Sequence, residues 1–512
     1  MRVLFVSSEV YPLAKSGGLA DVSWALPAAL ARLGVDVRLL IPGYPQALDK
    51  IAGKHIQTDL GDLLGAENAR LIAGRLPGAD LPVWLVDVPE LFRREGGLYQ
   101  DADGRDWPDN AIRFAALSHA GARLGLGIPE IGWQPDIIHV NDWHTGLLPL
   151  ILAASTGPRP ATLLTIHNMA FQGNFPAGIM PHLGIPGQRL HPESLADGLE
   201  FHGQISFLKA GIRYSDRLAT VSPTYAKEIL SPEFGFGFEG LLQHRAKDLT
   251  GILNGVDYGI WDPINDLYLP RAYGPGTVSD KKISKAKLQE ELRLPIVPDV
   301  PVIAFMSRLA HQKMVDIVLE ALPWIAGQAV QFVLLGEGDR DVENAFREMA
   351  HAHPEKIAVR IGYEEPLAHR LLAGADILLA PSRFEPCGLT HLYAARYGTL
   401  PIVRRTGGLA DTVIDSSRQT IKNQSATGFV FDDATITDMI TCLQSALSLY
   451  SEPLAWRRIQ LQAMKQDFGW ATSAQQYLTL YQSLTAQDKT IVRESDDLIF
   501  AQSVGQVAIG GD

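Results

Sequence analysis

The stretch Lys15-Ser16-Gly17-Gly18-Leu19-Ala20-Asp21-Val22 stands between an apolar run at residues 3–6 and a helical pattern of leucines that starts at Leu26. It therefore predicts a buried strand that leads through a glycine turn into a helix. Two adjacent glycines allow main-chain N–H groups to face outward, the start of a helix adds partial positive charge, and Lys15 adds a full one. Together these features favour a phosphate ligand, and the strand-turn-helix order indicates an α/β fold.

A second glycine turn, Gly407-Gly408-Leu409-Ala410-Asp411, repeats five letters of the first, again after an apolar run, at residues 400–403. Glycines between a strand and a helix can serve only to make room for the turn, and for an isolated pair this simpler interpretation stays open. Lys15 favours the phosphate interpretation for the first turn. Neither the dinucleotide-binding pattern Gly-x-Gly-x-x-Gly nor the triphosphate loop that ends in Gly-Lys-Ser/Thr occurs here.

The length and charge of the chain limit its class. The chain has 512 residues, of which 46% are hydrophobic, so we expect a globular protein of two large domains or three small ones. Lys and Arg number 45 against 57 Asp and Glu, which gives a net charge of -12 without long blocks of one sign. This balance argues against non-specific nucleic-acid binding.

The cysteines and the apolar runs bear on the compartment. Cys387 and Cys442 are the two cysteines, and they have no paired spacing, which fits a reducing compartment without a disulfide framework. The chain begins directly with strand residues, and no apolar run approaches the roughly 20 residues that span a bilayer. We therefore expect a cytoplasmic protein that does not bind a membrane.

Short β-rich runs alternate with helical stretches along the chain, as in parallel α/β layers. Six runs predict strands of one sheet, at residues 3–6, 35–40, 83–86, 137–140, 163–166 and 218–221. Five more predict a second sheet, at residues 302–306, 332–335, 357–361, 377–380 and 402–403. We also expect a helix over residues 111–124.

The domain boundaries follow from these two series. Residues 258–276 are rich in Pro, Gly and Tyr and show little periodicity, so we predict a linker there. We expect a first α/β domain over residues 1–257, a second over 277–485 whose final helix could cross back, and a flexible tail over 486–512. Because ligands of open α/β sheets sit beyond the carboxyl ends of strands, the two domains would face each other across a deep cleft.

Polar and ionisable residues gather where four of the predicted strands end. They are Asn141-Asp142-Trp143-His144-Thr145, His167-Asn168, Ser307-Arg308 with Lys313, and Pro381-Ser382-Arg383-Phe384-Glu385-Pro386-Cys387-Gly388-Leu389-Thr390. Singly, His144 or His167 would be a helix cap or a core histidine, but the whole group predicts a site. Arg308 and Lys313 suit a phosphate, because guanidinium offers a fork of donors and ammonium a point charge.

A metal centre is the weaker alternative. The histidine pairs His139/His144 and His351/His353 lack a carboxylate at ligand spacing. Asp101-Ala102-Asp103 matches a metal-binding pattern of one class of sugar transferases, but it stands in an acidic, turn-rich stretch that we interpret as a surface loop.

Seven motifs follow one another within residues 1–480. They are Lys15 through Val22, His139-Val140-Asn141-Asp142-Trp143-His144-Thr145, His167-Asn168-Met169-Ala170-Phe171-Gln172-Gly173, Asn254-Gly255-Val256-Asp257, Ser307-Arg308-Leu309 with Gln312-Lys313, Glu385-Pro386-Cys387-Gly388-Leu389-Thr390, and Gly407-Gly408-Leu409-Ala410-Asp411-Thr412-Val413. In this order they resemble the bacterial glycogen synthases and plant starch synthases.

The resemblance implies two facing Rossmann-like domains of the GT-B type. It also implies a glycosyltransferase that moves glucose from ADP-glucose to the non-reducing end of an α-1,4-glucan with retention of configuration. ADP-glucose is expected rather than UDP-glucose because the likeness is to the bacterial and plastid-like branch and not to the longer animal and fungal enzymes. ADP-glucose and the glucan would be the partners, with no nucleic acid, membrane, cofactor or metal.

The resemblance also assigns roles to residues at the strand ends. Catalysis falls to Glu385, Lys313, Arg308, His167 and Asp142. Donor binding falls to Lys15, Gly17, Gly18, Asp21, Asn254, Cys387, Gly388, Leu389 and Thr390. Tyr363, just past the predicted strand 357–361, is the ring best placed to stack on the base, although it could simply be a half-buried tyrosine at the domain surface.

Three positions depart from the family pattern. Met314 follows Lys313 where glycine is usual, His391 replaces a glutamine, and Tyr393 stands where many related transferases have a second glutamate. A sugar-nucleotide epimerase on the same scaffold and a glucan-binding protein without activity remain the alternatives. Retention of Glu385, Lys313 and Arg308 speaks against the second.

Overall fold

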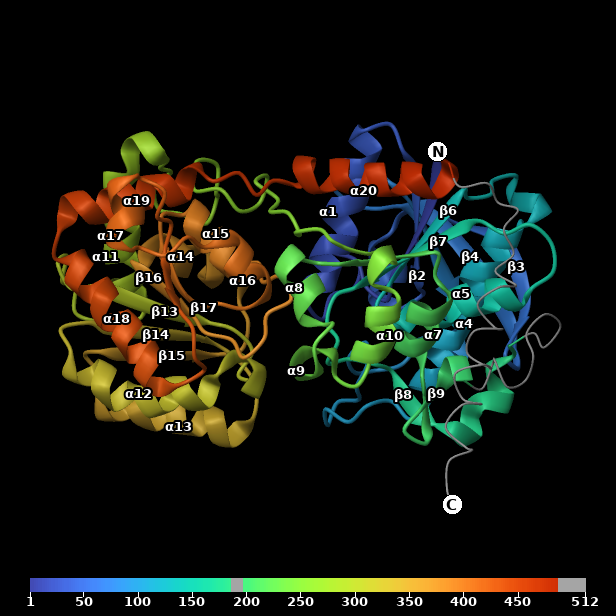
Figure 1. Ribbon diagram of the computed structural model, residues 1–512, viewed down its shortest axis with the longest axis horizontal. Helices are drawn as coiled ribbons and strands as arrows, with labels where there is room; N and C mark the ends of the chain where they lie inside the picture. Colours follow the sequence, from blue (N-terminus) through green and yellow to red (C-terminus); the bar gives the residue numbers. More distant parts are fainter. Residues whose placement is uncertain (186–196, 487–512) are drawn as a thin grey trace, which may run out of the picture.

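In the computed structural model, which describes residues 1–185 and 197–486, two sheets lie side by side, each covered by helices (Figure 1). The first sheet takes its strands from residues 2–251 and the second from residues 302–431. The expected two-domain α/β architecture is therefore confirmed. Residues 487–512 of the predicted tail lie outside the described residues.

Nine strands form the first sheet, in the order β12-β11-β7-β6-β1-β2-β5-β4-β3. Their bounds are β1 Arg2–Val6, β2 Asp36–Pro42, β3 Ala52–Leu63, β4 Ala66–Arg75, β5 Pro82–Asp87, β6 Ile137–Asn141, β7 Ala161–Ile166, β11 Arg217–Thr220 and β12 Leu249–Gly251. All six predicted strands are present and pair in parallel. Their apolar runs fit because helices cover both faces of such a sheet.

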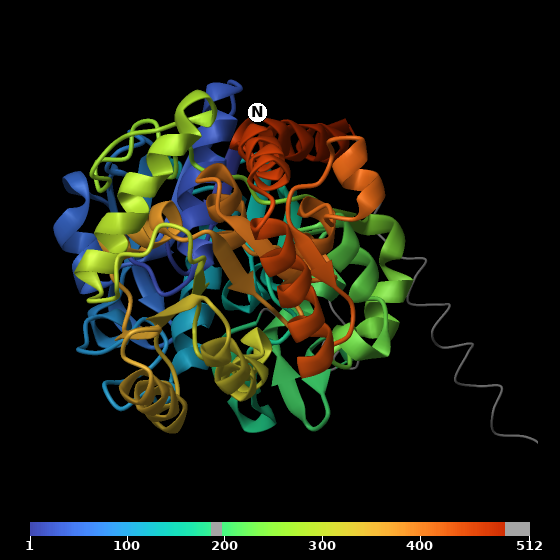
Figure 2. The same cartoon turned by 90° about the vertical axis from the view of Figure 1, so that its left-hand side faces the viewer.

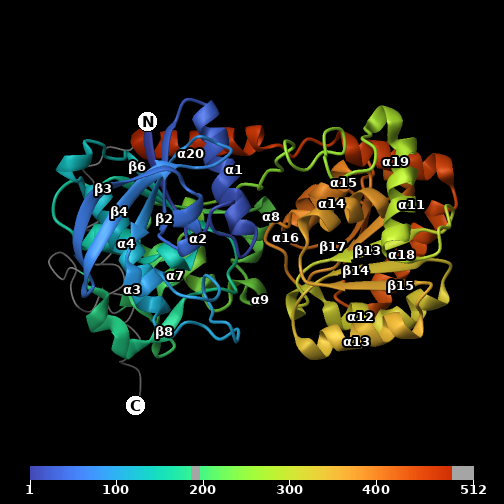
Figure 3. The same ribbon diagram turned by 180° about the vertical axis from the view of Figure 1, so that it is seen from behind.

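Three strands of the first sheet, β3, β4 and β12, were not predicted from the sequence. β3 and β4 form an antiparallel hairpin at the outer edge of the first domain, and Figure 3 shows it from behind. Most of β3 is exposed, and several register shifts interrupt its pairing with β4, so its sequence lacks a regular apolar alternation. Leu64 and Gly65 make the turn with positive φ.

Helices and a small sheet complete the first domain. The helices are α1 Gly18–Arg32, α2 Pro45–Lys50, α3 Pro89–Phe92, α4 Asn110–Leu126, α5 Leu147–Ala154, α7 Phe207–Tyr214, α8 Pro223–Glu228, α9 Pro232–Gly235 and α10 Glu239–His244, with short 3-10 turns η1 Pro129–Ile131, η2 Trp143–Thr145, η3 Ala177–Leu183 and η4 Ala246–Asp248. The small sheet joins β8 Asn174–Pro176, β10 Gln204–Ser206 and β9 Glu200–Phe201. The helix predicted at 111–124 is α4.

Six parallel strands form the second sheet, in the order β15-β14-β13-β16-β17-β18. They are β13 Val302–Met306, β14 Gln331–Gly336, β15 Ile357–Ile361, β16 Ile377–Ala380, β17 Leu400–Arg404 and β18 Phe429–Phe431. The five predicted strands are confirmed, and the three-residue β18 was missed. The helices of the second domain are η5 Pro275–Asp280, α11 Lys281–Glu291, η6 His311–Lys313, α12 Val315–Gly327, α13 Arg340–Ala352, α14 Glu365–Gly374, α15 Thr390–Arg396, α16 Gly407–Thr412, α17 Arg418–Lys422, α18 Ile436–Tyr450 and α19 Pro453–Lys465.

Alternate side chains of the second sheet fill two separate cores. Ile303 and Phe305 of β13 pack in one cluster with residues of α12 and α18, whereas Val302 and Ala304 pack in another with residues of α11 and α14. This alternation follows from the period of two along a strand. Figure 2 shows the helices on both sides of this sheet.

The chain passes between the domains twice, at two neighbouring segments. Ile252 belongs to the core of the first domain and Val256 to a core of the second, so the first crossing lies between them. The predicted linker at 258–276 is therefore wrong: Trp261 stacks on Tyr393 at 4.2 Å, and the Tyr273 hydroxyl donates to Tyr397 O at 2.8 Å. Its lack of periodicity reflects turns that pack on the second domain.

The last described helix, α20 Trp470–Ala486, returns to the first domain along the top of Figure 1. The second crossing lies beside the first, since the Val256 N–H donates to Phe468 O at 2.7 Å. On α20, Tyr481 hydrogen-bonds His139 Nδ1 at 2.7 Å in the first core. The prediction that the final helix of the second domain could cross back to the first is therefore confirmed by α20.

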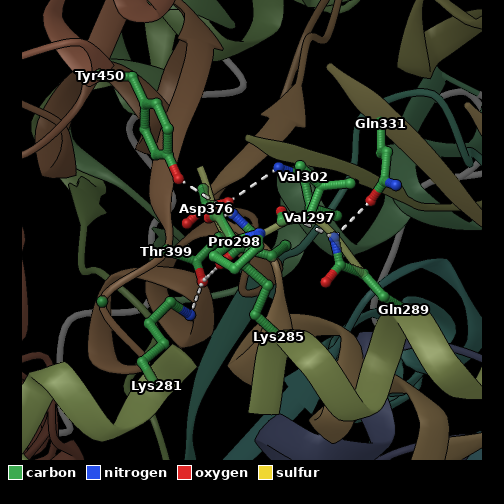
Figure 4. A network of polar contacts seen from close by, with 12 residues as sticks. Lys281, Lys285, Gln289, Val297, Pro298, Val302, Gln331, Asp376, Thr399 and Tyr450 are labelled. Carbon is green, nitrogen blue, oxygen red and sulfur yellow. Dashed lines mark hydrogen bonds and ion pairs between the residues drawn. The ribbon is translucent and has the colours of Figure 1, made fainter. Parts of the chain in front are cut away.

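Helix α11 places a polar face against the N-terminal ends of the second sheet (Figure 4). Lys281 donates to Thr399 Oγ1 at 2.7 Å, Lys285 pairs with Asp376 at 2.8 Å, and Gln289 donates to the Gln331 side chain at 2.8 Å. Because these α11 residues are spaced four apart, they share one face. This network ties α11 to strands at the end of the sheet away from the loops described next.

No helix within residues 1–185 and 197–486 has both the length and the apolar character needed to cross a membrane.

Candidate active site

The strand order of each sheet reverses beside a central strand. In the first sheet β1 lies between β2 and β6, and in the second β13 lies between β14 and β16. Chain connections lead away in opposite directions from such a point, and ligands bind in the space left beyond the carboxyl ends of the strands. The loops after β1, β6, β13 and β16 carry Lys15, Asp142, Lys313 and Glu385, so topology puts these residues at the ligand-binding edges.

The first glycine loop leads from β1 into α1, as predicted. Lys15 Nζ donates to Asp21 Oδ1 at 2.7 Å, and each side chain is about one-third exposed, at 33% and 32%. Burial raises the pKa of Asp21 and the Lys15 charge opposes that rise. Gly17 and Gly18 face open space where a side chain would stand. An anion can therefore approach the Lys15 ammonium and the start of α1.

Glu9 holds this loop from behind. Its Oε2 accepts the main-chain N–H groups of Ser16 at 2.5 Å and Gly17 at 3.0 Å, and its Oε1 accepts the hydroxyl of Tyr99 at 3.0 Å. Burial raises the pKa of Glu9 although these bonds favour the carboxylate. Two loop N–H groups are thus bound to Glu9, a partner that no sequence pattern indicated.

The phosphate interpretation, extended to the second glycine loop, would have its N–H groups face the diphosphate, but the structure bonds them within the protein. The Gly407 N–H donates to Glu228 Oε1 at 2.9 Å, and the Gly408 N–H donates to Glu385 O at 3.1 Å and Pro386 O at 3.2 Å. A Cβ at Gly407, where φ is 43°, would lie 1.9 Å from Glu385 O. Close backbone packing is therefore the reason for glycine here, which was the simpler of the two interpretations.

Asp142 and His167 meet at the ends of β6 and β7. Asp142 is buried, and its Oδ1 accepts the His167 main-chain N–H at 2.7 Å. Burial raises the pKa of Asp142 to about 7 against the N–H bonds that lower it. Asp142 has φ 56° and ψ -174°, a backbone conformation that residues other than glycine rarely adopt and that surrounding contacts must hold.

The imidazole of His167 has a defined proton position. Asn141 Nδ2 donates to Val6 O at 3.0 Å, which turns the Asn141 amide oxygen toward His167 Nε2, also at 3.0 Å. Since an amide oxygen only accepts, Nε2 carries the proton and Nδ1 keeps its lone pair. Desolvation lowers the pKa of His167 to about 3, so the ring is neutral at pH 7.

On the second domain, Glu385 lies in a pocket of donors. Its Oε2 accepts Lys313 Nζ in a short ion pair and the Ser382 hydroxyl at 2.8 Å. Burial raises the pKa of Glu385, but the charge and hydrogen bond of Lys313, then Ser382, outweigh it and lower the pKa below its usual value. Glu385 is therefore a carboxylate at pH 7. Arg308 is exposed and has no ion pair with any residue that the structure describes.

The walls of the two domains influence each other directly. Tyr363 follows β15 after Gly362, which has φ 103°, and is 55% exposed. Partial burial and then the charges of Glu365 and Asp21 raise the pKa of the Tyr363 hydroxyl. Asp21 lies in the first turn of α1, directly after the Lys15 loop, so Tyr363 of the second domain faces this part of the first domain.

The remaining predicted donor-binding residues lie at the crossing and on the loop after β16. Asn254 is buried, and its Oδ1 has no hydrogen-bond partner among the described residues. An unpaired buried carbonyl oxygen is costly unless a ligand or water satisfies it. Cys387 is a buried free thiol whose pKa burial raises to about 12, so it packs as a small apolar group. Gly388 has φ 72°, and Leu389 and Thr390 begin α15.

Each departure from the family pattern has a structural outcome. Met314 adopts φ 52° and ψ 33°, the left-handed conformation that glycine takes without strain. His391 is buried and joins its Nε2 to Thr412 Oγ1 at 2.7 Å, and burial lowers its pKa to about 4. Tyr393 stacks on Trp261. None of these side chains displaces Lys313 or Glu385 from contact with each other.

Sequence patterns did not indicate Glu9, Tyr225 or Glu228 as site residues, whereas Ser382 belongs to the polar stretch that was predicted after the strand at 377–380. Glu9 stands three residues after the apolar run at residues 3–6, and this position could have marked it as a buried charge. Glu228 carries no local signal, because its partner Gly407 is 179 residues away. His139 and His144, weighed as ligands, are core residues, with His144 stacked on Trp143 at 3.9 Å.

No group of three or more His, Cys, Asp or Glu side chains in residues 1–185 and 197–486 could hold a metal ion. Asp101 instead accepts the main-chain N–H groups of Asp103 and Arg105, each at 2.9 Å, which makes a surface turn.

Comparison with protein families matches both domains. Residues 2–244 match the family described as "Starch synthase catalytic domain", and residues 288–460 match "Glycosyl transferases group 1". The glycogen synthase of Paramagnetospirillum magneticum is 54% identical over 489 residues, 95% of this chain and 98% of that protein. The glycogen synthase of Burkholderia thailandensis is 49% identical over 96% of this chain and 92% of that protein.

Two solved structures are also similar. The catalytic domain of starch synthase IV from Arabidopsis thaliana, bound to ADP and acarbose, superposes with a TM-score of 0.84 at 30% identity, covering 95% of this chain and 99% of that one. A sucrose-phosphate synthase from Thermosynechococcus elongatus has a TM-score of 0.58 at 17% identity over 95% and 100% of the two chains, which supports the fold alone.

Proposed function

The chain belongs to the glycogen synthase family of glycosyltransferases, and on this premise we propose that it transfers glucose from ADP-glucose to the non-reducing end of an α-1,4-glucan with retention of configuration. Family membership favours this transferase over the epimerase and the inactive glucan-binding protein. ADP is the nucleotide bound by the similar plant starch synthase, and this supports ADP-glucose as the donor.

The diphosphate of the donor would lie between the cations of the two walls. Lys15 from the first domain and Lys313 and Arg308 from the second supply three positive charges. Charge accumulates on the diphosphate as the glycosidic bond to it breaks, so preorganised cations stabilise the transition state more than the ground state. Lys313 has three ammonium donors and can contact a phosphate oxygen while it remains bonded to Glu385.

Glu385 would accept hydrogen bonds from hydroxyl groups of the donor glucose. Its ionised state, kept by Lys313 and Ser382, makes it an acceptor of strong, charge-assisted bonds. Asp142 and the neutral His167 on the other wall would lie near the anomeric carbon, where an oxocarbenium-like charge develops, and would orient donor and acceptor. We do not assign a covalent nucleophile.

The nucleoside would lie against Tyr363. Its ring is exposed on the wall that faces the Lys15 loop, and an exposed aromatic face can stack on a base. The unpaired Oδ1 of Asn254 can accept a hydrogen bond from a hydroxyl group of ADP-glucose. Gly388, Leu389 and Thr390 complete the proposed donor site.

Metal-independent activity in the cytoplasm is part of the proposal. The three cations take the role that a divalent ion has in other transferases. The two buried, unpaired cysteines support a reducing compartment.

The observation that carries the proposal is the Lys313–Glu385–Ser382 cluster at the end of β16, in a protein whose opposite wall bears Asp142 and His167. The test is a comparison of initial rates of glycogen elongation from ADP-glucose and UDP-glucose at equal low concentration. We expect ADP-glucose to be faster and the anomeric configuration, followed by NMR, to be retained. Faster elongation from UDP-glucose would contradict the donor assignment and leave the transferase intact.

A further inference from the structure

Helices α8 and α16 join the two domains by two reciprocal contacts. Thr224, at the start of α8, donates its N–H to Asp411 Oδ2 at 2.9 Å and its hydroxyl to Asp411 Oδ1 at 2.6 Å. At the other end, Glu228 Oε1 accepts the Gly407 N–H at 2.9 Å and the Thr406 hydroxyl at 3.1 Å. Each helix therefore receives a carboxylate at its N-terminus from the other. These contacts make the two helices antiparallel, and both helices lie between the domains in Figure 1.

On the first domain, α8 is bonded to the loop that carries His167. The Tyr225 hydroxyl accepts the Met169 N–H at 3.0 Å, two residues after His167. Tyr225 is buried, and burial is the largest cause of its raised pKa. The charges of Asp142, Glu228 and Glu385 raise the pKa of Tyr225 further. Tyr225 thus lies within electrostatic reach of both walls of the site.

On the second domain, α16 is bonded to the loop that carries Glu385. The Gly408 N–H donates to Glu385 O, and the absence of a side chain at Gly407 allows Glu385 O to approach its Cα. Thr412, at the end of α16, donates to Gly408 O at 2.6 Å and bonds His391 beside Glu385. A shift of α16 would therefore move the backbone on which Glu385 stands.

We propose that Thr224, Glu228 and Asp411 are positioning residues of the transfer reaction, because their contacts between α8 and α16 align Glu385 with His167 across the two domains. This inference rests on the proposed role of Glu385. The chain crosses between the domains only at two adjacent segments within the described residues, so few covalent constraints fix the angle between the domains and side-chain contacts must set it. Displacing a reacting group by about 1 Å can lower a rate by about 10²-fold.

The test uses Glu228→Gln and Asp411→Asn, which keep the shape of each side chain but remove its charge. We expect kcat to fall about tenfold or more in each variant, with the KM for glycogen within about twofold and ADP still bound once per chain by calorimetry. Small-angle scattering should show less compaction of the variants with ADP and maltoheptaose than of the parent. Thr224→Val should act in the same direction more weakly, since it removes one of two bonds.

Asp80→Asn and Glu291→Gln are matched controls, one in each domain. Both remove a carboxylate charge from an exposed ion pair, with Arg75 and Arg370 respectively, and should leave kcat unchanged. An unchanged kcat in both Glu228→Gln and Asp411→Asn would overturn the inference. So would a loss of rate that matches a loss of ADP-binding sites, because the contact would then support only the fold. Glu385→Gln tests the proposed active site separately from the positioning role of the α8–α16 contacts. Near-native activity of that variant would reject the proposed site itself.

Discussion

The main-chain N–H of His167 donates to the buried carboxylate of Asp142, and this bond joins the ends of β6 and β7. The bond helps to hold Asp142 in its unfavourable backbone conformation, together with the Asp142 N–H bonded to Thr165 O at 3.0 Å. Such strain costs about 1–3 kcal/mol and persists only where surrounding contacts fix it. The side chain of Asp142 is thereby aimed along the edge where His167 also lies, on the wall that faces Glu385.

Asp142→Asn should change the pH dependence of stability. The pKa of Asp142 in the folded protein, about 7, is above its unfolded value, so between about pH 4 and 7 the folded state binds more protons. Stability from this group is therefore present at low pH and is lost as pH rises through 7. Asparagine does not ionise, so the variant does not lose this stability. Its Tm should therefore rise relative to that of the parent as the pH increases from 5 to 8. A constant difference in Tm over this range would contradict a raised pKa.

Lys313→Ala should lower kcat by about 10²–10³-fold, the usual cost of about 2.7–4 kcal/mol for one preorganised contact to a developing charge. Glu385→Gln should be similarly severe with the fold intact. The measurement is steady-state kinetics with varied donor and glycogen. Lys287→Ala, which removes an exposed lysine paired with Glu290, is the control. A Lys313→Ala enzyme of normal turnover would show that this ammonium does not contact the reacting group.

The sequence predicted the central strands because burial on both faces demands continuous apolar runs, as at residues 137–140. It did not predict β3, because an exposed edge strand needs no such run. It placed Asp142, His167, Lys313 and Glu385 at strand ends, where parallel topology brings them to the ligand-binding edges. The bonds from Glu228 to Gly407 and from Tyr481 to His139 join residues 179 and 342 positions apart, and no local pattern encodes either partner.

Excess EDTA should leave elongation of glycogen from ADP-glucose within about twofold of its original rate. The physical reason is that, in the proposed site, Lys15, Arg308 and Lys313 would provide the charge that a divalent ion brings to the diphosphate in other transferases. The rate should be measured after dialysis against EDTA and again after magnesium is added. Activity that disappears in EDTA and returns with magnesium would reject the metal-independent mechanism.

Tyr481→Phe should destabilise the first domain by about 1–3 kcal/mol, because it leaves a buried polar atom of His139 without its partner. Turnover per folded molecule should not change, since this bond holds α20 and not the site. Thermal unfolding of this variant is compared with that of Tyr268→Phe, which alters a 44% exposed tyrosine. Equal melting temperatures for the two variants would mean that the hydroxyl contributes little to docking of α20.

Tyr363→Ala should raise the KM for ADP-glucose more than it lowers kcat. The ring is 55% exposed at the end of β15, and the proposed stacking on the base would contribute to binding in the ground state and the transition state alike. Loss of uniform binding raises KM and leaves kcat nearly constant. Tyr363→Phe keeps the ring and should retain a near-native KM, which separates stacking from a role of the hydroxyl. The KM for glycogen should be unchanged in both variants. If Tyr363→Ala instead lowered kcat at an unchanged donor KM, the ring would act on the chemical step or on closure of the domains, and the base would have to be bound elsewhere on the second wall.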